Sequence, residues 1–315
     1  MKVSVVVPTH SRTETLFNTL NSLEKQQLSN DYEIIVVDNN TNVEISNKIK
    51  GFLKNKGNRF IYLQERKIGL HNARHAGARY AKGEILAYVD DDAIYDSSWL
   101  SEILRPYSDK TVGCVGGRVY PRWEKDPPRW VNYLSKAYLS LLDLGDDIKE
   151  VEYIYGLNFS IRKDLLFKLK GFNPDSFGDI WLGDGEIGLL NKVHKTGLKI
   201  IYNPKAVAWH VIPPERLTIA YAKRRFANEG GCASYADFKE KQMSPCSLLR
   251  RSFMFLLYFI LHKLFALMGK IVRNDKFYVL NEVNSSFSLS RFFYELRLVY
   301  DRKLKDMVLK DNWLE

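Results

Sequence analysis

Three consecutive aspartates, Asp90, Asp91 and Asp92, are the residues whose type and spacing most directly suggest chemistry. They follow an apolar run of five residues at 85–89, which has the length of a buried strand. Adjacent carboxylates repel one another, and burying them without partners costs free energy. A divalent cation such as Mg²⁺ or Mn²⁺ removes this cost, because these ions prefer oxygen ligands. The triplet therefore predicts a cation site at Asp90 and Asp92, with a solvated acidic turn as the alternative.

Strands and helices are expected to alternate through the first 110 residues. β-branched runs at 3–7, 32–37, 59–63 and 85–89 have strand character, and segments with helical spacing separate them at 14–27, 45–53 and 70–82. This alternation predicts an α/β fold with a mostly parallel sheet flanked by helices. Ligands bind such sheets beyond the carboxyl ends of the strands. Three strand ends carry polar residues, namely Thr9 with Arg12, Asp38, and the aspartate triplet.

Asp38 stands where an acid can hydrogen-bond a ribose or a base in nucleotide-binding α/β folds. The first strand is not followed by Gly-x-Gly-x-x-Gly, and the chain has no Gly-x₄-Gly-Lys-Ser/Thr motif. Dinucleotide dehydrogenases and phosphate-loop enzymes are therefore disfavoured. Phosphates would instead depend on the cation, with Arg12, Arg66 or Arg74 as additional charges.

Five short blocks resemble, in order and spacing, the family 2 glycosyltransferases of the GT-A (Rossmann-like) fold. They are VSVVVPT at 3–9, IVVDN at 35–39, Gly69 with NAR at 72–74, GEI at 83–85 and VDDD at 89–92. The resemblance extends over about residues 1–230. It implies transfer of a sugar with inversion from a UDP-, GDP- or dTDP-sugar, and a Mn²⁺ or Mg²⁺ cofactor on an Asp-x-Asp motif.

The resemblance also implies roles for individual residues. Thr9 and Asp38 would contact the nucleoside, while Asp90 and Asp92 would serve the ribose, the diphosphate and the metal. The implied nucleotide-sugar site comprises Thr9, Arg12, Asp38, Arg74, Asp90, Asp91, Arg224 and Arg225. Two departures from the family pattern are present: Asn39-Asn40 replaces Asp-Gly, and His75 replaces an asparagine.

The segment GDGEIG at 183–188 opens a predicted helix and resembles the family's Glu-Asp-x-Glu/Asp block. Inverting transfer needs a carboxylate that accepts the proton of the attacking hydroxyl. Asp184 falls on the position of the family's base, with Gly183 in place of the usual Glu, and Glu186 is the second candidate. Alternatively, both acids only complement the helix dipole.

His210, Arg224 and Arg225 are further candidates late in the chain. His210 follows a strand where some GT-A enzymes place a third metal ligand, although a structural histidine is the alternative. The paired arginines lie on a predicted helix and would reach the diphosphate when the donor loop closes, unless they simply form a solvated face.

Residues 248–268 form a very apolar segment that His262-Lys263 interrupts, so no uninterrupted run of 18 apolar residues is present. On a helical wheel, Arg251, His262, Lys263, Lys270 and Arg273 fall within an arc of roughly 120°. This pattern predicts a helix in the membrane interface with its cations near anionic headgroups. A core helix is the alternative. A second basic amphipathic helix is expected at 291–310.

The formal charge of +10 is uneven, since residues 211–315 hold 18 Lys and Arg against 11 Asp and Glu. Such a basic bias fits nucleic acid, anionic lipid or phosphorylated substrates. Three widely spaced cysteines fit a reducing compartment, and no signal peptide is recognisable at the N-terminus. We therefore expect a cytoplasmic protein that is peripheral on the inner face of the cell membrane.

The expected organisation has three parts: residues 1–110 bind the nucleotide-sugar, 111–230 bind the acceptor and catalyse, and 231–315 form an amphipathic helical extension. The expected partners are a nucleotide-sugar, a cell-surface glycan or lipid-linked acceptor, and the membrane surface, but no nucleic acid. Two other hypotheses are a basic nucleic-acid-binding protein and a sugar-phosphate nucleotidylyltransferase. The first does not explain acids at strand ends, and the second lacks its glycine-rich phosphate loop.

Overall fold

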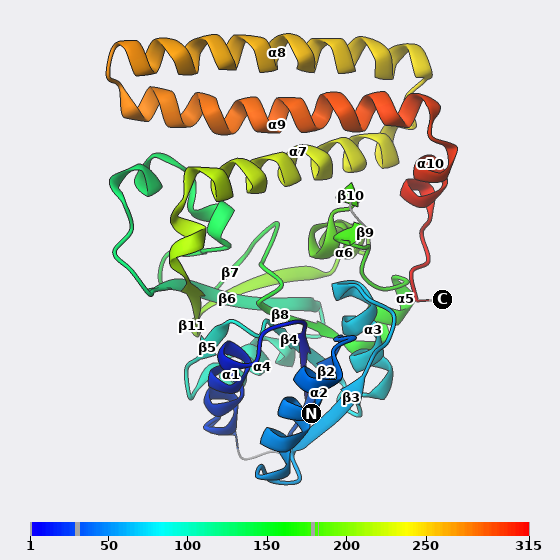
Figure 1. Cartoon of the computed structure of the whole chain (residues 1–315). Coiled ribbons are helices and arrows are strands. Elements are labelled where there is room, and N and C mark those ends of the chain that lie inside the picture. Colours follow the sequence, from blue (N-terminus) through cyan, green and yellow to red (C-terminus); the bar gives the residue numbers. More distant parts are fainter. Residues whose placement is uncertain (1, 29–31, 178–179, 182, 315) are drawn as a thin grey trace.

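The computed structural model describes residues 2–28, 32–177, 180–181 and 183–314. A nine-stranded sheet with flanking helices forms its lower part in Figure 1, and long C-terminal helices cover one end. The strands of this sheet are β1 (Val3–Thr9), β2 (Tyr32–Asp38), β3 (Phe60–Gln64), β4 (Ile85–Val89), β5 (Ala93–Tyr95), β6 (Val112–Trp123), β7 (Lys149–Glu150), β8 (Asn158–Arg162) and β11 (Lys199–Ile212). A separate pair joins β9 (Ser176–Phe177) to β10 (Ile180–Trp181).

The α-helices alternate with the strands and then continue alone after β11. They are α1 (Glu14–Glu24), α2 (Val43–Lys54), α3 (Leu70–Tyr80), α4 (Trp99–Leu104), α5 (Lys163–Lys168), α6 (Gly185–His194), α7 (Ile219–Lys241), α8 (Pro245–Ile271), α9 (Asp275–Tyr300) and α10 (Arg302–Leu309). Four 3₁₀ helices complete the described structure: η1 (Arg105–Ser108), η2 (Arg129–Tyr133), η3 (Lys136–Leu139) and η4 (Pro214–Leu217).

The strand order is β3-β2-β1-β4-β8-β6-β11-β5, with β7 beside β11. Strands β1 to β4 pair in parallel, because a crossover helix separates each from the next. Strand β8 instead lies antiparallel between β4 and β6. The predicted α/β sheet with flanking helices is confirmed, and its strand direction is mixed beyond the N-terminal half.

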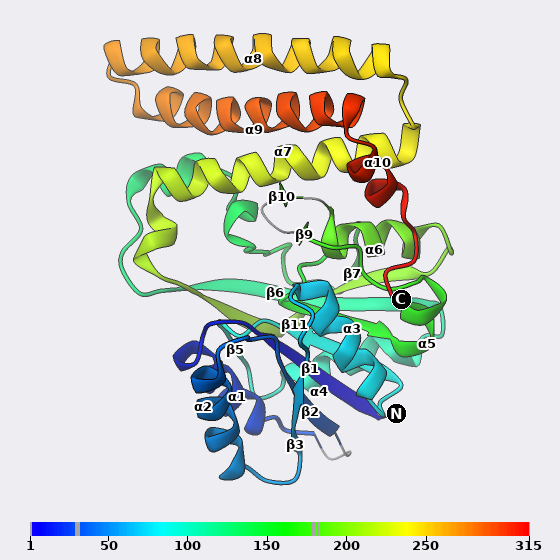
Figure 2. The same cartoon turned by 45° about the vertical axis from the view of Figure 1, so that its right-hand side comes forward.

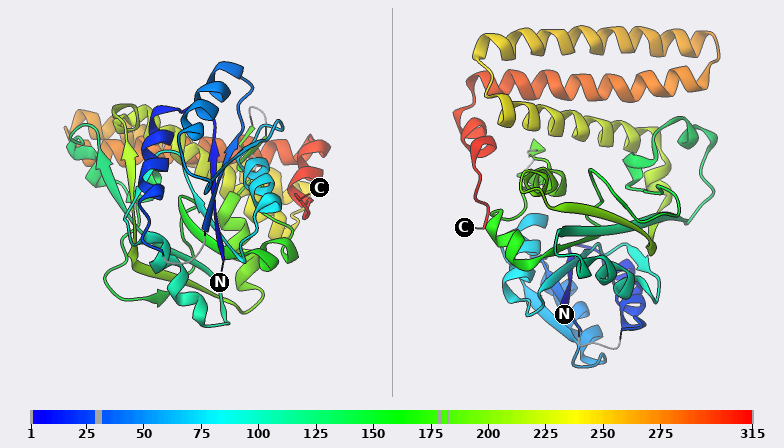
Figure 3. Two further views of the ribbon diagram at one scale, coloured as in Figure 1. Left: turned by 90° about the horizontal axis from the view of Figure 1, so that it is seen from below. Right: turned by 180° about the vertical axis from the view of Figure 1, so that it is seen from behind.

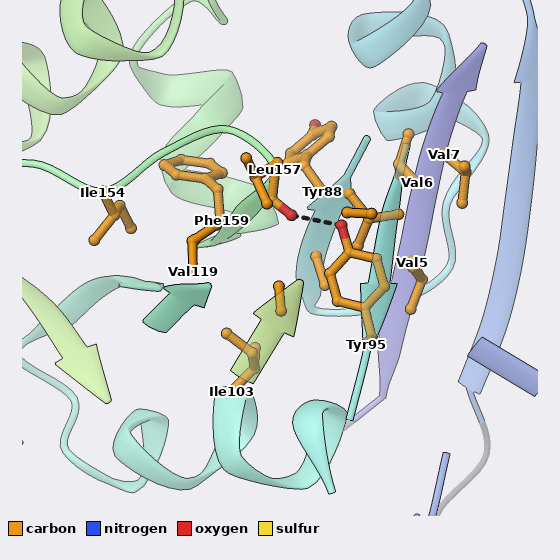
Figure 4. Close-up of a cluster of buried hydrophobic side chains, with 14 of the residues drawn as sticks. Val5, Val6, Val7, Tyr88, Tyr95, Ile103, Val119, Ile154, Leu157 and Phe159 are labelled. Atoms are coloured by element: carbon orange, nitrogen blue, oxygen red, sulfur yellow. Dashed lines mark hydrogen bonds between the residues drawn. The ribbon is translucent and has the colours of Figure 1, made fainter. Parts of the chain in front are cut away.

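In the core around β4 and β5, valine, isoleucine and leucine side chains pack with three aromatic residues, Tyr88, Tyr95 and Phe159 (Figure 4). Strand β4 carries Tyr88, which packs with Phe159 of β8 at 6.0 Å between ring centroids. The Tyr95 hydroxyl donates to the Leu157 carbonyl at 2.6 Å and so ties β5 to the start of β8. Because these side chains are buried, the chain on both sides of the triplet is held in place.

Three long helices form layers above the sheet, in the order α7, α9 and α8 from the sheet outward (Figures 2 and 3). The predicted helix at 291–310 is wrong as a single element. Asp301 interrupts it, with φ −88° and ψ 94°, and its side chain caps α10 by accepting from the Leu304 amide at 3.0 Å.

Three polar side chains of the predicted arc on α8 point toward its neighbours α7 and α9. The pairs are Arg251 with Asp237 and Glu295, His262 with Asn281, and Lys263 with Glu282, all within 3.0 Å. The prediction that Arg251, His262 and Lys263 lie at lipid headgroups is therefore wrong. Acids on the neighbouring helices supply the charge partners, and only Lys270 and Arg273 of the predicted arc are exposed at the helix end.

The opposite face of α8 is apolar and exposed. Its most exposed side chains include Phe253, Leu257, Ile260, Leu264, Leu267, Met268 and Ile271. In the part of the chain that the structure describes, α8 is the one helix long and apolar enough to cross a membrane. The core helix of a soluble protein can be equally long and apolar, but it is mostly buried. In α8, only 22% of the most apolar 18-residue stretch is buried.

The predicted boundary at 110 falls between η1 and β6, inside one continuous sheet, and the boundary at 230 falls within α7. The predicted division of roles at residues 110 and 230, between donor binding, acceptor binding and the helical extension, stays a prediction. Structurally, the helical extension begins with α7.

Candidate active site

A cavity of about 450 Å³, here called the inner cavity, opens at the carboxyl ends of β1, β2 and β4. Of the predicted residues, it is lined by Thr9, Arg12, Asp90, Asp91, Asp92, His210 and Arg225. This arrangement agrees with the expectation that the ends of parallel strands bring Thr9, Arg12 and the aspartate triplet together.

Asp92 is the centre of charge in the inner cavity. Arg216 Nη2 donates to its Oδ2 at 2.6 Å, and Arg12 Nη1 donates to the same oxygen. His210 Nε2 lies 3.5 Å from the other oxygen. Burial opposes ionisation, but the positive charges of Arg216 and Arg12 lower the pKa of Asp92 well below its ordinary value. Asp92 is therefore a permanent anion.

Asp90 and Asp91 point in different directions from Asp92. Asp91 accepts from the Thr9 hydroxyl at 2.7 Å and lies 3.4 Å from Arg12, so it joins β1 to β4. The Asp90 side chain is 34% exposed, and Arg74 lies 3.7 Å behind it. Of the three carboxylates, Asp90 is thus the one most open to a ligand.

His210 is oriented as a metal ligand would be. Its Nδ1 donates to the Leu139 carbonyl at 2.8 Å, since a carbonyl can only accept. The lone pair of Nε2 therefore faces Asp92 and accepts from Arg216 at 2.6 Å. Asp90, Asp92 and His210 thus have the right donor atoms for Mn²⁺ or Mg²⁺. Across the described residues, however, no three acidic, cysteine or histidine side chains form a ready-made metal cluster.

Arg74 connects Asp90 to Glu186 of α6. Its guanidinium is almost fully buried and lies 3.3 Å from Glu186 Oε2. Glu186 Oε1 accepts from the Gly156 amide at 3.1 Å. A Cβ at residue 156 would lie 2.3 Å from Arg74 Nη2, so a side chain there would displace the guanidinium from its present position. The result is a chain of contacts from Asp90 through Arg74 to Glu186.

Asp184 lies apart from that chain of contacts. Its Oδ1 accepts from Asn173 at 2.8 Å, and it borders a different cavity together with Lys192 and Lys239. Burial raises the pKa of Asp184. The two predicted candidates for the base are therefore in different surroundings, and Glu186 is the one connected to the inner cavity.

The family is decided by a match to the family model for glycosyl transferase family 2, which covers residues 4–170, more than half of the chain. This chain is a family 2 glycosyltransferase. The predicted family and enzyme class are confirmed, and the nucleotidylyltransferase hypothesis is set aside.

Curated relatives and a solved structure agree with this assignment. The glucosyl-dolichyl phosphate glucuronosyltransferase of Haloferax volcanii is 27% identical over 67% of this chain and 69% of its own. The GalNAc(5)-diNAcBac-PP-undecaprenol β-1,3-glucosyltransferase of Campylobacter jejuni is 26% identical over 56% and 57%. The crystal structure of GalNAc-T7 with UDP, GalNAc and Mn²⁺ matches with a TM-score of 0.54 and 21% identity, over 67% of this chain and 43% of that one. This last likeness shows the GT-A fold.

In this glycosyltransferase Asp38 lies below the inner cavity rather than on its wall. It accepts from Tyr62 and from the Asn40 side chain, each at 2.6 Å. Burial opposes its ionisation, but these hydrogen bonds lower the pKa of Asp38. Asn39 lines the cavity in its place and accepts from the Gly69 amide at 2.9 Å. The predicted contact between Asp38 and a nucleoside remains a prediction.

Sequence reasoning missed two functional candidates, Arg216 and Asp175. Arg216 contacts both Asp92 and His210. In the sequence, the only indication that Arg216 belongs to the site is its position six residues after His210. Burial raises the pKa of Asp175 to about 7; the charge of Arg74 opposes this rise, and Glu186 and Asp90 add to it. Asp175 therefore belongs to the same group of charges as Glu186, and nothing in its sequence context indicated this.

The two predicted arginines of α7 occupy different positions. Arg225 lines the inner cavity, whereas Arg224 lines a neighbouring one. Their predicted contacts with the donor diphosphate are untested.

Proposed function

We propose that this glycosyltransferase moves a sugar, with inversion, from a UDP-, GDP- or dTDP-sugar to a cell-surface glycan or a lipid-linked acceptor. The observation that carries the proposal is the meeting of Asp90, Asp92, His210, Arg12 and Arg216 at the strand ends, where anionic and cationic groups can together hold a diphosphate and its cation. The named substrates of the Haloferax and Campylobacter relatives are lipid-linked phosphates, which supports the acceptor class.

Asp90, Asp92 and His210 would hold Mn²⁺ or Mg²⁺, which offsets the charge of the leaving diphosphate when bound. Arg12 and Arg216, which contact Asp92 in this structure, are within reach of phosphate oxygens in the same cavity. Glu186, oriented by Arg74, takes the proton of the acceptor hydroxyl as that oxygen bonds to C1 of the sugar. The bond from C1 to the diphosphate breaks, and its electron pair leaves with the diphosphate.

The donor is identified by calorimetry with a panel of UDP-, GDP- and dTDP-sugars, first with Mn²⁺ and then with EDTA. We expect micromolar binding of one base class and at least about tenfold weaker binding after the metal is removed, because two carboxylates then repel the diphosphate. Adenosine monophosphate serves as the control. A panel in which nothing binds in either condition would refute the proposed donor.

We further propose that the exposed apolar face of α8 contacts the hydrocarbon of the inner leaflet of the cell membrane. An apolar patch of this size on a soluble protein indicates an interaction surface. Exposed cations at both ends, Arg250, Lys270 and Arg273, suit anionic headgroups at the rim of that face. Since Arg251 and Lys263 pair internally, the contact should be mainly hydrophobic.

Replacing Leu257 and Leu264 together with glutamate is expected to release the protein from vesicles containing anionic lipid. Each leucine is just over half exposed, so burying the exposed part in hydrocarbon is worth about 1 kcal/mol per leucine. The assay is flotation on a density gradient, where the wild type should float even in high salt. Val43→Glu, at an even more exposed apolar site on α2, is the control and should float normally. Equal flotation of the double variant would contradict the proposal.

A further inference from the structure

A second cavity of about 440 Å³, here called the outer cavity, adjoins the inner one. Both are lined by Arg12, Asp92, Arg216, Tyr221 and Arg225, which therefore lie between or beside the two cavities. Asn39 and Gly69 line only the inner cavity. The outer cavity therefore lies beyond the cation site, away from the end that would hold the nucleoside.

The outer cavity has an excess of positive charge. Four arginines line it, Arg12, Arg216, Arg224 and Arg225, against Asp92, Glu124 and Glu215. Arg12 and Arg216 already contact Asp92. The other two, Arg224 and Arg225, both lie on α7, and their charges still need partners.

Arg224 and Arg225 are weakly compensated. Arg225 lies 3.9 Å from Glu229, and its buried Nε has no hydrogen-bond partner. Arg224 stacks on the Tyr221 ring at 5.2 Å and, within the described residues, forms no ion pair. Arg224 is exposed and both arginines line the outer cavity, so an anion there would supply acceptors to guanidinium groups that have few now.

The donor's diphosphate in the inner cavity does not account for Arg224, the one arginine of the outer cavity that does not also line the inner one. The proposed cation ligands Asp90 and His210 line the inner cavity only, and Arg224 lines the outer cavity only. We propose that the outer cavity binds a phosphate ester of the acceptor at the same time as the donor occupies the inner cavity. This inference rests on the proposed function and deepens it: the acceptor carries its phosphate close to the reacting hydroxyl, as in a short glycan on a lipid phosphate.

The test uses the full chain and calorimetry with geranyl phosphate as a soluble probe, both with and without saturating nucleoside diphosphate and Mn²⁺. We expect geranyl phosphate to bind the nucleotide-saturated protein. Arg224→Gln should weaken that binding at least about tenfold, with the nucleotide Kd within about twofold of the wild type, and Arg224→Lys should restore part of it. Arg105→Gln, at an exposed arginine that lines neither cavity, is the matched control.

Two outcomes overturn the inference: geranyl phosphate fails to bind the wild type, or Arg224→Gln leaves geranyl phosphate binding unchanged, whatever its effect on the nucleotide. Methyl glucuronide separates a phosphate site from a carboxylate site, and preferential binding of the glucuronide also overturns the inference. Failure of the donor proposal is recognised separately, because the nucleotide then does not bind the protein. The dependence of geranyl phosphate binding on Arg224 is still measured in the experiment without nucleotide.

Discussion

Replacing Asp92 with asparagine is expected to lower kcat/KM for sugar transfer by about a thousandfold or more. The carboxylate is a permanent anion between Arg216, Arg12 and His210, and asparagine keeps its shape but not its charge. The variant therefore loses the group that would bind the cation, and it leaves Arg216 without its counter-charge and Arg12 with Asp91 alone. The measurement is release of nucleoside diphosphate in the presence of acceptor, together with titration of Mn²⁺.

Asp91→Asn is the matched comparison, one residue away on the same turn. Asp91 is turned toward Thr9 and Arg12, so it should affect activity through the position of β1 rather than through the cation. We expect a smaller loss than for Asp92→Asn and unchanged dependence on Mn²⁺. Activity of Asp92→Asn above a tenth of the wild type, with its melting temperature unchanged, would rule out the role proposed for Asp92.

The part of the site built from neighbouring parallel strands was predictable. Thr9 ends β1 and the aspartate triplet follows β4, and these two strands pair directly. A buried apolar run that stops at polar residues marks a strand end, and parallel pairing brings such ends to one edge. The same reasoning worked less well for Asp38, because it cannot distinguish a residue on the cavity wall from one just below it.

The position of His210 depends on a pairing distant in sequence. His210 lies opposite Ala93 in the antiparallel pair of β11 and β5, and the Val211 amide donates to the Asp92 carbonyl at 2.9 Å. This register brings the histidine next to Asp92 across more than a hundred residues. Local patterns carry no information about such a register, so only the family resemblance suggested it.

The orientation of α8 could not be predicted for a related reason. A helical wheel correctly separates its cations from its apolar residues, but it does not say which face meets the protein. Glu282 and Glu295 of α9 determine that the polar face of α8 meets the protein, because they form ion pairs with Lys263 and Arg251. A buried charge needs a partner, whereas an apolar face can be left for a membrane.

Glu186→Gln is expected to lower kcat by about a hundredfold to ten-thousandfold, the usual contribution of a general base. Glutamine keeps the oxygen that accepts from the Gly156 amide, so the start of α6 should stay in place. The donor Kd should change little, because Glu186 does not line the inner cavity. The measurement is single-turnover transfer at saturating donor, together with the donor Kd.

Asp184→Asn distinguishes the two candidate bases. Asp184 accepts from Asn173 and borders a cavity other than the inner one, so we expect a loss of kcat below about tenfold and an unchanged pH profile. The reverse order, with a large loss for Asp184→Asn and a small one for Glu186→Gln, would assign the base to Asp184. Because Glu186 is joined to Asp90 through Arg74 while Asp184 faces Lys192 and Lys239, that reversal would also require α6 to turn when the acceptor binds.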